Sequence, residues 1–257
     1  MCELLGLNAN VPTDICFSFT GLVQRGGRTG PHKDGWGICL YEGRGSRSFH
    51  DPRPSVASEI AELLQRHAIK SRIIISHIRQ ANRGRVCLEN THPFTRELWG
   101  ESWSCAHNGQ LRGVKKLPQT HYHPIGTTDS EYAFCWLLDR IRERFPGRPR
   151  SARQLWAFIH ARARELDEVG IFSFLLSDSR VLYCYCSNNM CWITRRHPFG
   201  QARLIDTGQV VDFSQETTPK DIVTVIASRA LTDNEQWQHM QQGDFQVFRA
   251  GLPVYQP

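Results

Sequence analysis

The second half of the sequence contains six short apolar segments, of which the first four follow one another with only short turns between them. They are rich in β-branched and aromatic residues, which is typical of strands, and they cover residues 171–178, 181–187, 191–196, 202–206, 221–228 and 245–255. Parallel strands need a long crossover connection, usually a helix, whereas antiparallel strands can be joined by tight turns. The spacing therefore predicts mainly antiparallel pairing and argues against a doubly wound parallel sheet.

The first half of the chain alternates between predicted strands and predicted helices. Apolar runs indicate strands at 2–8, 35–43, 72–79 and 102–111, and amphipathic or capped segments indicate helices at 13–27, 55–69, 127–145 and 151–170. The chain has 257 residues, of which 40% are hydrophobic, so it can bury a sizeable core. Because no repeat, heptad pattern or low-complexity linker divides it, we expect one α/β domain with mainly antiparallel strands and two central helices.

The charge distribution, the cysteines and the N-terminal sequence argue against a nucleic-acid-binding, secreted or membrane protein. The formal net charge is +6, and much of it lies in the arginine-rich segment 139–153, which lacks the interleaved aromatic residues of single-stranded nucleic-acid binding sites. The nine cysteines are scattered and do not form a secreted disulfide framework. The N-terminus has no signal-peptide pattern, and no apolar run reaches about 18 residues. We therefore expect a cytoplasmic protein with reduced thiols, no membrane segment and no nucleic-acid partner.

Two segments contain residue types that ligate metals. Residues 184–191 place three cysteines at C-x-C-x₄-C spacing with His197 close by, which is not the C-x₂-C spacing of structural zinc sites. Cys184 and Cys186 are two positions apart on a predicted strand, so we expect them to pack on one side of it. The histidines of 121–124 lie in a predicted loop. We expect no metal ion and no other cofactor.

The cysteine at position 2 has two interpretations. It can be a small buried hydrophobic residue of the first strand, alongside Leu4. Alternatively, removal of Met1 makes it the first residue, and its free α-amine, with a pKa of about 7.7–8.0, can take the proton of a thiol whose pKa is about 8.5. Position alone does not decide between a packing cysteine and a nucleophile that carries its own base.

Three further segments allow both a structural and a chemical interpretation. Arg79 ends an apolar strand, where it either turns to solvent or offers a bidentate guanidinium to a substrate carboxylate. Asn108 and Gly109 form the commonest hairpin dipeptide, but a side-chain amide beside an unobstructed backbone N–H can also form an oxyanion hole. Asp129 either caps the helix predicted at 127–145 or binds a cationic ammonium group.

The chain closely resembles the class II glutamine amidotransferase domain, a family of N-terminal-nucleophile hydrolases. The motifs that carry the resemblance occur in the family's order: Cys2, HIRQA…G (77–84), NTHPF (90–94), HNG (107–109) and TDSE (128–131). Longer stretches such as MCELLGLNANVPTDICFSFTGL and TVIASRALTDNEQW look like the stand-alone, YafJ-type members of the family. The resemblance covers 1–257 as one domain without a synthase domain. It implies an α+β fold, a four-layer αββα sandwich of two mainly antiparallel sheets.

The resemblance also implies a role for each motif residue. Cys2 would be the nucleophile that attacks the side-chain amide of glutamine, with its freed α-amine as general acid and base. The Asn108 side chain and the Gly109 backbone N–H would hold the oxyanion. Arg79 would bind the α-carboxylate of glutamine and Asp129 its α-ammonium group, with Asn82 and His92 as further substrate-binding residues.

The chain departs from the family's common pattern on the segment that covers the substrate. Many members read HTRWAT where this chain reads HIRQAN, so Gln80 replaces a tryptophan. Asn82 stands where a threonine often contacts glutamine. These changes are compatible with glutamine recognition. They affect the segment that covers the substrate, and so how it closes over the substrate and how strictly the site selects glutamine.

The reaction that the resemblance implies releases ammonia from glutamine and hydrolyses a γ-glutamyl thioester to glutamate. In one version the ammonia passes to an unidentified synthase chain as partner. In another, the protein is a free-standing hydrolase of a γ-glutamyl amide in a peptide or metabolite. Two alternatives come from other classes: a glutamine-binding sensor without turnover, and a basic nucleic-acid-binding protein, which salt-dependent retention on DNA or RNA would distinguish.

Overall fold

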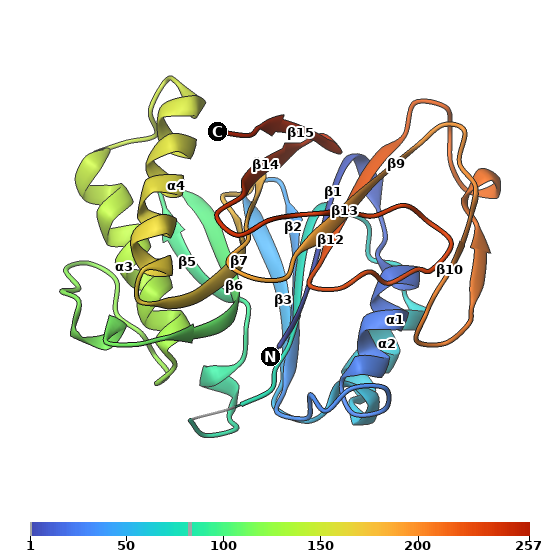
Figure 1. The fold of residues 1–257 in the computed structure, drawn as a ribbon, viewed down its shortest axis with the longest axis horizontal. Coiled ribbons are helices and arrows are strands. Elements are labelled where there is room, and N and C mark those ends of the chain that lie inside the picture. The colour runs from blue at the N-terminus through green and yellow to red at the C-terminus, as the bar shows by residue number, and fades with distance from the viewer. Residues whose placement is uncertain (1, 82–83) are drawn as a thin grey trace.

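The chain folds into four layers, as a computed structural model that describes residues 2–81 and 84–257 shows (Figure 1). Two β-sheets pack face to face in the middle, and a pair of helices covers the outer face of each sheet. The order of the layers is therefore helix, sheet, sheet, helix. This arrangement confirms the αββα sandwich of two mainly antiparallel sheets that the resemblance implies.

The first sheet holds the start of the chain at its centre. Its seven strands lie in the order β13-β9-β12-β1-β4-β2-β3, and each pair is antiparallel. Because β1 lies between β12 and β4, the residue that precedes β1 reaches the middle of one edge of the sandwich. The bounds are β1 (Glu3–Thr13), β2 (Trp36–Glu42), β3 (Gly45–Asp51), β4 (Ser71–Ile78), β9 (Cys191–Arg196), β12 (Ile222–Ala227) and β13 (Gln238–His239).

The second sheet has six antiparallel strands in the order β15-β14-β8-β7-β6-β5. Their bounds are β5 (Phe94–Leu98), β6 (Glu101–Leu111), β7 (Gly170–Ser177), β8 (Leu182–Tyr185), β14 (Phe245–Arg249) and β15 (Leu252–Tyr255). A separate two-stranded ribbon consists of β10 (Gln201–Arg203) and β11 (Val210–Asp212).

Each sheet has its own pair of helices. α1 (Cys16–Arg25) and α2 (Glu59–Arg66) cover the first sheet, and α3 (Asp129–Arg144) and α4 (Ala152–Asp167) cover the second (Figure 1). Short 3-10 turns occur at Ser55–Ala57, Leu88–Asn90, Val114–Lys116 and Phe213–Gln215. Within the described residues, no helix is long and apolar enough to cross a membrane.

The alternation of side chains along the strands builds three hydrophobic cores. On β1, Leu5 and Leu7 pack toward α1 and α2, whereas Leu4 packs between the two sheets. Cys184 and Cys186 both lie in the core between the sheets, as expected for residues two positions apart on a strand. A third core fills the space between the second sheet and its helices.

Most predicted elements are present, and the differences have local causes. The helix predicted at 55–69 is shorter, because a 3-10 turn precedes Ser58, whose side chain accepts the Ala61 N–H and begins α2. The last predicted strand, 245–255, is a hairpin of β14 and β15. β3 was not predicted, because its sequence GSRSFHD is a largely exposed edge strand with little apolar pattern.

Candidate active site

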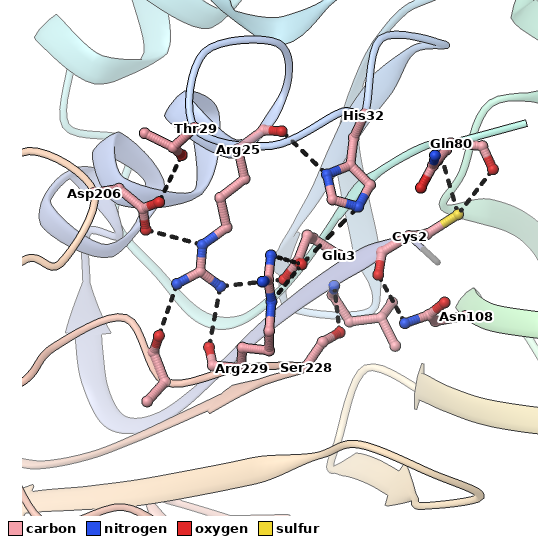
Figure 2. A network of polar contacts seen from close by, with 12 residues as sticks. Cys2, Glu3, Arg25, Thr29, His32, Gln80, Asn108, Asp206, Ser228 and Arg229 are labelled. Atoms are coloured by element: carbon pink, nitrogen blue, oxygen red, sulfur yellow. Dashed lines mark hydrogen bonds and ion pairs between the residues drawn. The ribbon is translucent and has the colours of Figure 1, made fainter.

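Cys2 lies directly before β1 and contacts both sheets (Figure 2). Its Sγ accepts the backbone N–H of Gln80 at 3.3 Å and lies 3.5 Å from the Gln80 carbonyl oxygen, at the end of β4. Its own carbonyl oxygen accepts a hydrogen bond from Nδ2 of Asn108 on β6, at 2.7 Å. The cysteine is therefore held between the end of the first sheet and a strand of the second.

The surroundings of the Cys2 thiol keep it protonated. Burial raises the pKa of the thiol, while the Gln80 N–H and the positive charge of Arg79 act in the opposite direction with smaller effect. A thiol with a raised pKa is a weak nucleophile unless a base removes its proton. Attack by this sulfur therefore needs a base close to it.

Arg79 is buried beside Cys2. The register of β1 and β4 pairs Glu3 with Ile78, so Arg79 follows the strand directly opposite Cys2. The arginine is only 3% exposed, so the alternative in which it turns to solvent is wrong. Nη1 donates to the Arg85 carbonyl oxygen at 3.1 Å, and the backbone N–H donates to Gly35.

The Arg79 guanidinium has no carboxylate partner within the described part of the chain. Buried cations are normally paired with an anion, because an unpaired buried charge is costly. Asp34 is a neighbour of Arg79, but its Oδ2 accepts the backbone N–H of Ala81 at 2.7 Å. This carboxylate therefore fixes the backbone that follows Arg79 and does not pair with the guanidinium. The guanidinium is thus available to an anion that enters the site.

Asn108 and Gly109 lie inside β6, so the interpretation of this dipeptide as a hairpin turn is wrong. They pair with Ser173 and Phe172 of β7, and the ladder of β6 and β7 overrides the local preference of the dipeptide for a turn. Gly109 has a φ of 156°, and a Cβ there would lie 1.9 Å from the carbonyl oxygen of Ile171. This position therefore requires glycine for close approach of two strands.

The Asn108 amide faces Cys2 and can donate one more hydrogen bond than it makes to the cysteine. The residue is 3% exposed, and its Oδ1 has no hydrogen-bond partner within residues 2–81 and 84–257. Its NH₂ group has two hydrogens, and one of them serves the Cys2 carbonyl oxygen. The second hydrogen is available to an oxygen that develops negative charge next to the sulfur.

Asp129 begins α3 and is anchored to the end of β6. Thr128 is the N-cap, since its side chain accepts the Glu131 N–H at 3.2 Å, so Asp129 is not the helix cap. Asp129 Oδ2 accepts the backbone N–H of Leu111 at 2.7 Å, three residues beyond Asn108. Each carboxylate oxygen can accept further hydrogen bonds, so the group retains acceptor capacity for a cation.

His92 is buried and packs against His77, with ring centroids 4.2 Å apart and the ring planes tilted by 42°. Burial lowers the pKa of both histidines well below the ordinary value, so both rings are neutral at pH 7. Neither ring makes a hydrogen bond in the part of the chain that the structure covers. The role of His92 toward substrate stays a prediction, and Asn82, the other predicted substrate-binding residue, lies outside the described residues.

A buried ion-pair network behind Cys2 was not predicted (Figure 2). Glu3, the residue after the cysteine, pairs with Arg25 at 3.1 Å and with Arg229, whose Nε donates at 2.8 Å. Arg25 also pairs with Asp206 at 2.9 Å. The sequence signal for this network was a single glutamate inside the apolar segment CELLGLN. Its arginine partners lie far from it in the sequence, so the pairing could not be predicted.

His107 was named only as part of the HNG motif, and no role was predicted for its side chain. Its Nε2 lies 3.0 Å from the Ile171 carbonyl oxygen and therefore carries the proton, so Nδ1 accepts the Ser130 hydroxyl at 2.8 Å. The ring thus joins β6, β7 and the first turn of α3, immediately next to Asn108. No group of three or more metal-ligating side chains occurs within the described residues.

Solved structures similar to this chain define the fold. A crystal structure titled as a predicted glutamine amidotransferase from Pseudomonas aeruginosa has a TM-score of 0.80 and 50% identity, and covers 99% of this chain and 100% of that one. Glutamine phosphoribosylpyrophosphate amidotransferase from B. subtilis has a TM-score of 0.60 at 17% identity, over 96% of this chain and 47% of its own. The fold is that of the N-terminal-nucleophile amidotransferases.

The sequence comparisons give the family. The family model "Glutamine amidotransferases class-II" matches residues 1–256, so the chain belongs to the class II glutamine amidotransferases. It is 59% identical to the Escherichia coli protein described as "Putative glutamine amidotransferase YafJ", over 99% of this chain and 100% of the relative. A Haemophilus influenzae protein described as "Putative glutamine amidotransferase" is 42% identical, over 99% of this chain and 86% of the relative.

Proposed function

We propose that the protein is a glutamine amidohydrolase in which Cys2 is the nucleophile. The observation that carries the proposal is that three groups come together: the Cys2 thiol before β1, the Asn108 amide inside β6 and the Arg79 guanidinium after β4, which is buried without a carboxylate partner among the described residues. The first can attack an amide carbonyl, the second can stabilise the resulting oxyanion, and the third can bind a carboxylate. Glutamine carries both the amide and the carboxylate.

The reaction begins with proton removal from Cys2. After loss of Met1, the α-amine of Cys2 takes the thiol proton, and the sulfur attacks the side-chain carbonyl carbon of glutamine. The tetrahedral oxyanion accepts hydrogen bonds from Asn108 Nδ2 and the Gly109 N–H. The C–N bond then breaks, and the protonated α-amine returns its proton to the leaving nitrogen, so ammonia departs and a γ-glutamyl thioester remains.

Water completes the cycle. The α-amine, now neutral, takes a proton from a water molecule that attacks the thioester carbonyl. The C–S bond then breaks and the α-amine returns this proton to the sulfur, which gives glutamate and regenerates the free thiol. Arg79 and Asp129 would hold the α-carboxylate and α-ammonium group of the substrate throughout. A substrate with a free α-amino acid end is therefore expected, with His92 and Asn82 near its path.

A free-standing γ-glutamyl hydrolase is the second candidate. A γ-glutamyl peptide carries the same free α-carboxylate and α-ammonium group as glutamine, so Arg79 and Asp129 would hold either substrate in the same way. In this version the leaving group is the amine of a γ-glutamyl peptide or metabolite. In the version with an acceptor, a separate synthase chain would take up the ammonia.

A product assay separates these possibilities. Ammonia and glutamate are measured with glutamine, and glutamate and free amine with γ-glutamyl dipeptides, for the wild type and for Cys2→Ser and Cys16→Ser. Cys16 is a matched control, because it is also a partly exposed free thiol but lies on α1. Turnover that survives in Cys16→Ser and is lost in Cys2→Ser supports the proposal. Equal turnover in both variants, or none with any γ-glutamyl substrate, contradicts it.

A further inference from the structure

A cleft of about 780 Å³ lies at the opposite end of the sandwich from Cys2. It is lined by residues at the far ends of β1, β2 and β4 in the first sheet. Residues 179–180, between β7 and β8, and residues 249–250, at the end of β14, line it from the second sheet. Asn8, which lines it, is six positions from Cys2 along β1, or about 20 Å at the usual strand rise. Figure 1 shows the same separation, with the chain start below and β14 and β15 above.

The lining is strongly cationic. Five basic side chains line the cleft and only one carboxylate, Glu42, does so; the basic residues are Arg47, Lys70, Arg72, Arg180 and Arg249. Arg47 pairs with Glu42 at 2.6 Å, and Arg180 pairs with Glu101, so these two have anionic partners already. Arg249 lies over the ring of Trp156, 5.3 Å from its centroid.

Lys70 and Arg72 are the two lining cations that have neither an anionic nor an aromatic partner within the described residues, whereas Arg249 has only its aromatic contact. Both are exposed, and neither makes an ion pair or hydrogen bond with any residue in the ranges that the structure covers. They are two positions apart at the start of β4, so their side chains leave the strand on the same side. Two like charges held side by side at the rim of a hollow attract a multiply charged anion.

The same cleft also has an apolar part. Leu40 and Ile69, which belong to the core under α1 and α2, line it together with the cations. Pockets for small organic ligands combine apolar side chains with a few placed polar groups, and their usual volumes include the one found here. A purely electrostatic surface for nucleic acid or phosphate ions would not need an apolar lining.

We propose that this cleft is a second binding site, for a small organic molecule that carries phosphate groups. Its phosphates lie against Lys70 and Arg72, and its organic part lies against Leu40 and Ile69. Because the cleft is about 20 Å from Cys2, the ligand binds without touching the glutamine site. The proposal goes beyond the proposed amidohydrolase activity and does not depend on it.

The test is isothermal titration calorimetry of the full chain at physiological salt. The probes are ATP, fructose 1,6-bisphosphate and ribose 5-phosphate, with inorganic tripolyphosphate to distinguish a bare anion from an organic phosphate. The variants are the double substitutions K70A/R72A and K116A/R153A. Lys116 and Arg153 are exposed cations outside the cleft, so the second double variant removes the same charge elsewhere.

We expect at least one organic phosphate to bind more tightly than tripolyphosphate, and K70A/R72A to weaken that binding at least about tenfold, as loss of charge-assisted hydrogen bonds does. K116A/R153A should change it less than about twofold. The proposal is overturned if no organic phosphate binds at about 5 mM, a limit that corresponds to very weak affinity. It is also overturned if tripolyphosphate binds as tightly, or if both double variants weaken binding equally.

Discussion

Replacement of Asn108 by alanine tests the oxyanion stabilisation that the site geometry supports. The substitution removes Nδ2, which lies 2.7 Å from the Cys2 carbonyl oxygen and has one further hydrogen to offer. Loss of one oxyanion donor costs about 2.7–4 kcal/mol of transition-state stabilisation, which corresponds to a fall of about 10²–10³ in kcat. The donor acts on charge that exists only in the transition state, so KM should change little.

The effect of Asn108→Ala on folding should be small by comparison. The variant loses one hydrogen bond, worth about 1 kcal/mol, but it also removes the buried Oδ1, which has no hydrogen-bond partner within the described residues. The two contributions partly cancel, so the free energy of unfolding should fall by about 1 kcal/mol or less. Urea unfolding measures this separately from catalysis.

The assay compares steady-state ammonia release by the wild type, Asn108→Ala and Gln110→Ala. Gln110 is the matched control, since it lies on the same strand but is exposed. Its substitution should leave kcat unchanged. A kcat for Asn108→Ala within about threefold of the wild type, far from the loss expected of an oxyanion donor, would refute the reasoning. So would a variant that raises KM at unchanged kcat.

Three further predictions follow from the buried charges. Arg79→Ala should raise KM for glutamine about 10–100-fold, with a smaller change in kcat, because it removes charge-assisted hydrogen bonds to a carboxylate; an unchanged KM would contradict that role. Glu3→Gln should lower the free energy of unfolding by about 3 kcal/mol, because it removes one member of a buried ion pair. The control Glu62→Gln, in the exposed pair with Arg66, should change the free energy of unfolding by less than about 1 kcal/mol. Equal losses in the two variants would refute the burial argument. Burial lowers the pKa of His77 and His92, so below about pH 6.5 the unfolded chain binds protons that the folded chain does not, and the free energy of unfolding should fall as the pH decreases. Urea unfolding of His92→Phe should show a shallower fall with pH than the wild type. An identical fall would contradict the assignment of this pH dependence to the buried histidines.

The sequence was informative where one segment determines its own structure. The short strands of the second half, the helices α3 and α4, and the strand that ends at Arg79 follow from local apolar periodicity. The position of Cys2 and the order of the motifs also sufficed to nominate the site residues, because the family resemblance depends on order along the chain.

Features that depend on partners distant in sequence could not be predicted. Asn108 and Gly109 prefer a turn locally, but pairing with β7 holds them extended. The burial of Arg79 depends on the loop that carries Gly35, and the network around Glu3 depends on Arg25 and Arg229. No local pattern encodes these contacts.

The central claim, that Cys2 becomes the N-terminal nucleophile, is tested most directly by intact mass spectrometry before and after treatment with 6-diazo-5-oxo-L-norleucine, an alkylating analogue of glutamine. Peptide mapping then locates the adduct. The account predicts a chain that has lost Met1 and carries a single adduct on Cys2, and a chain with Met1 retained that stays unlabelled until an aminopeptidase removes it. A processed chain without an adduct, or with the adduct on another cysteine, would contradict the account.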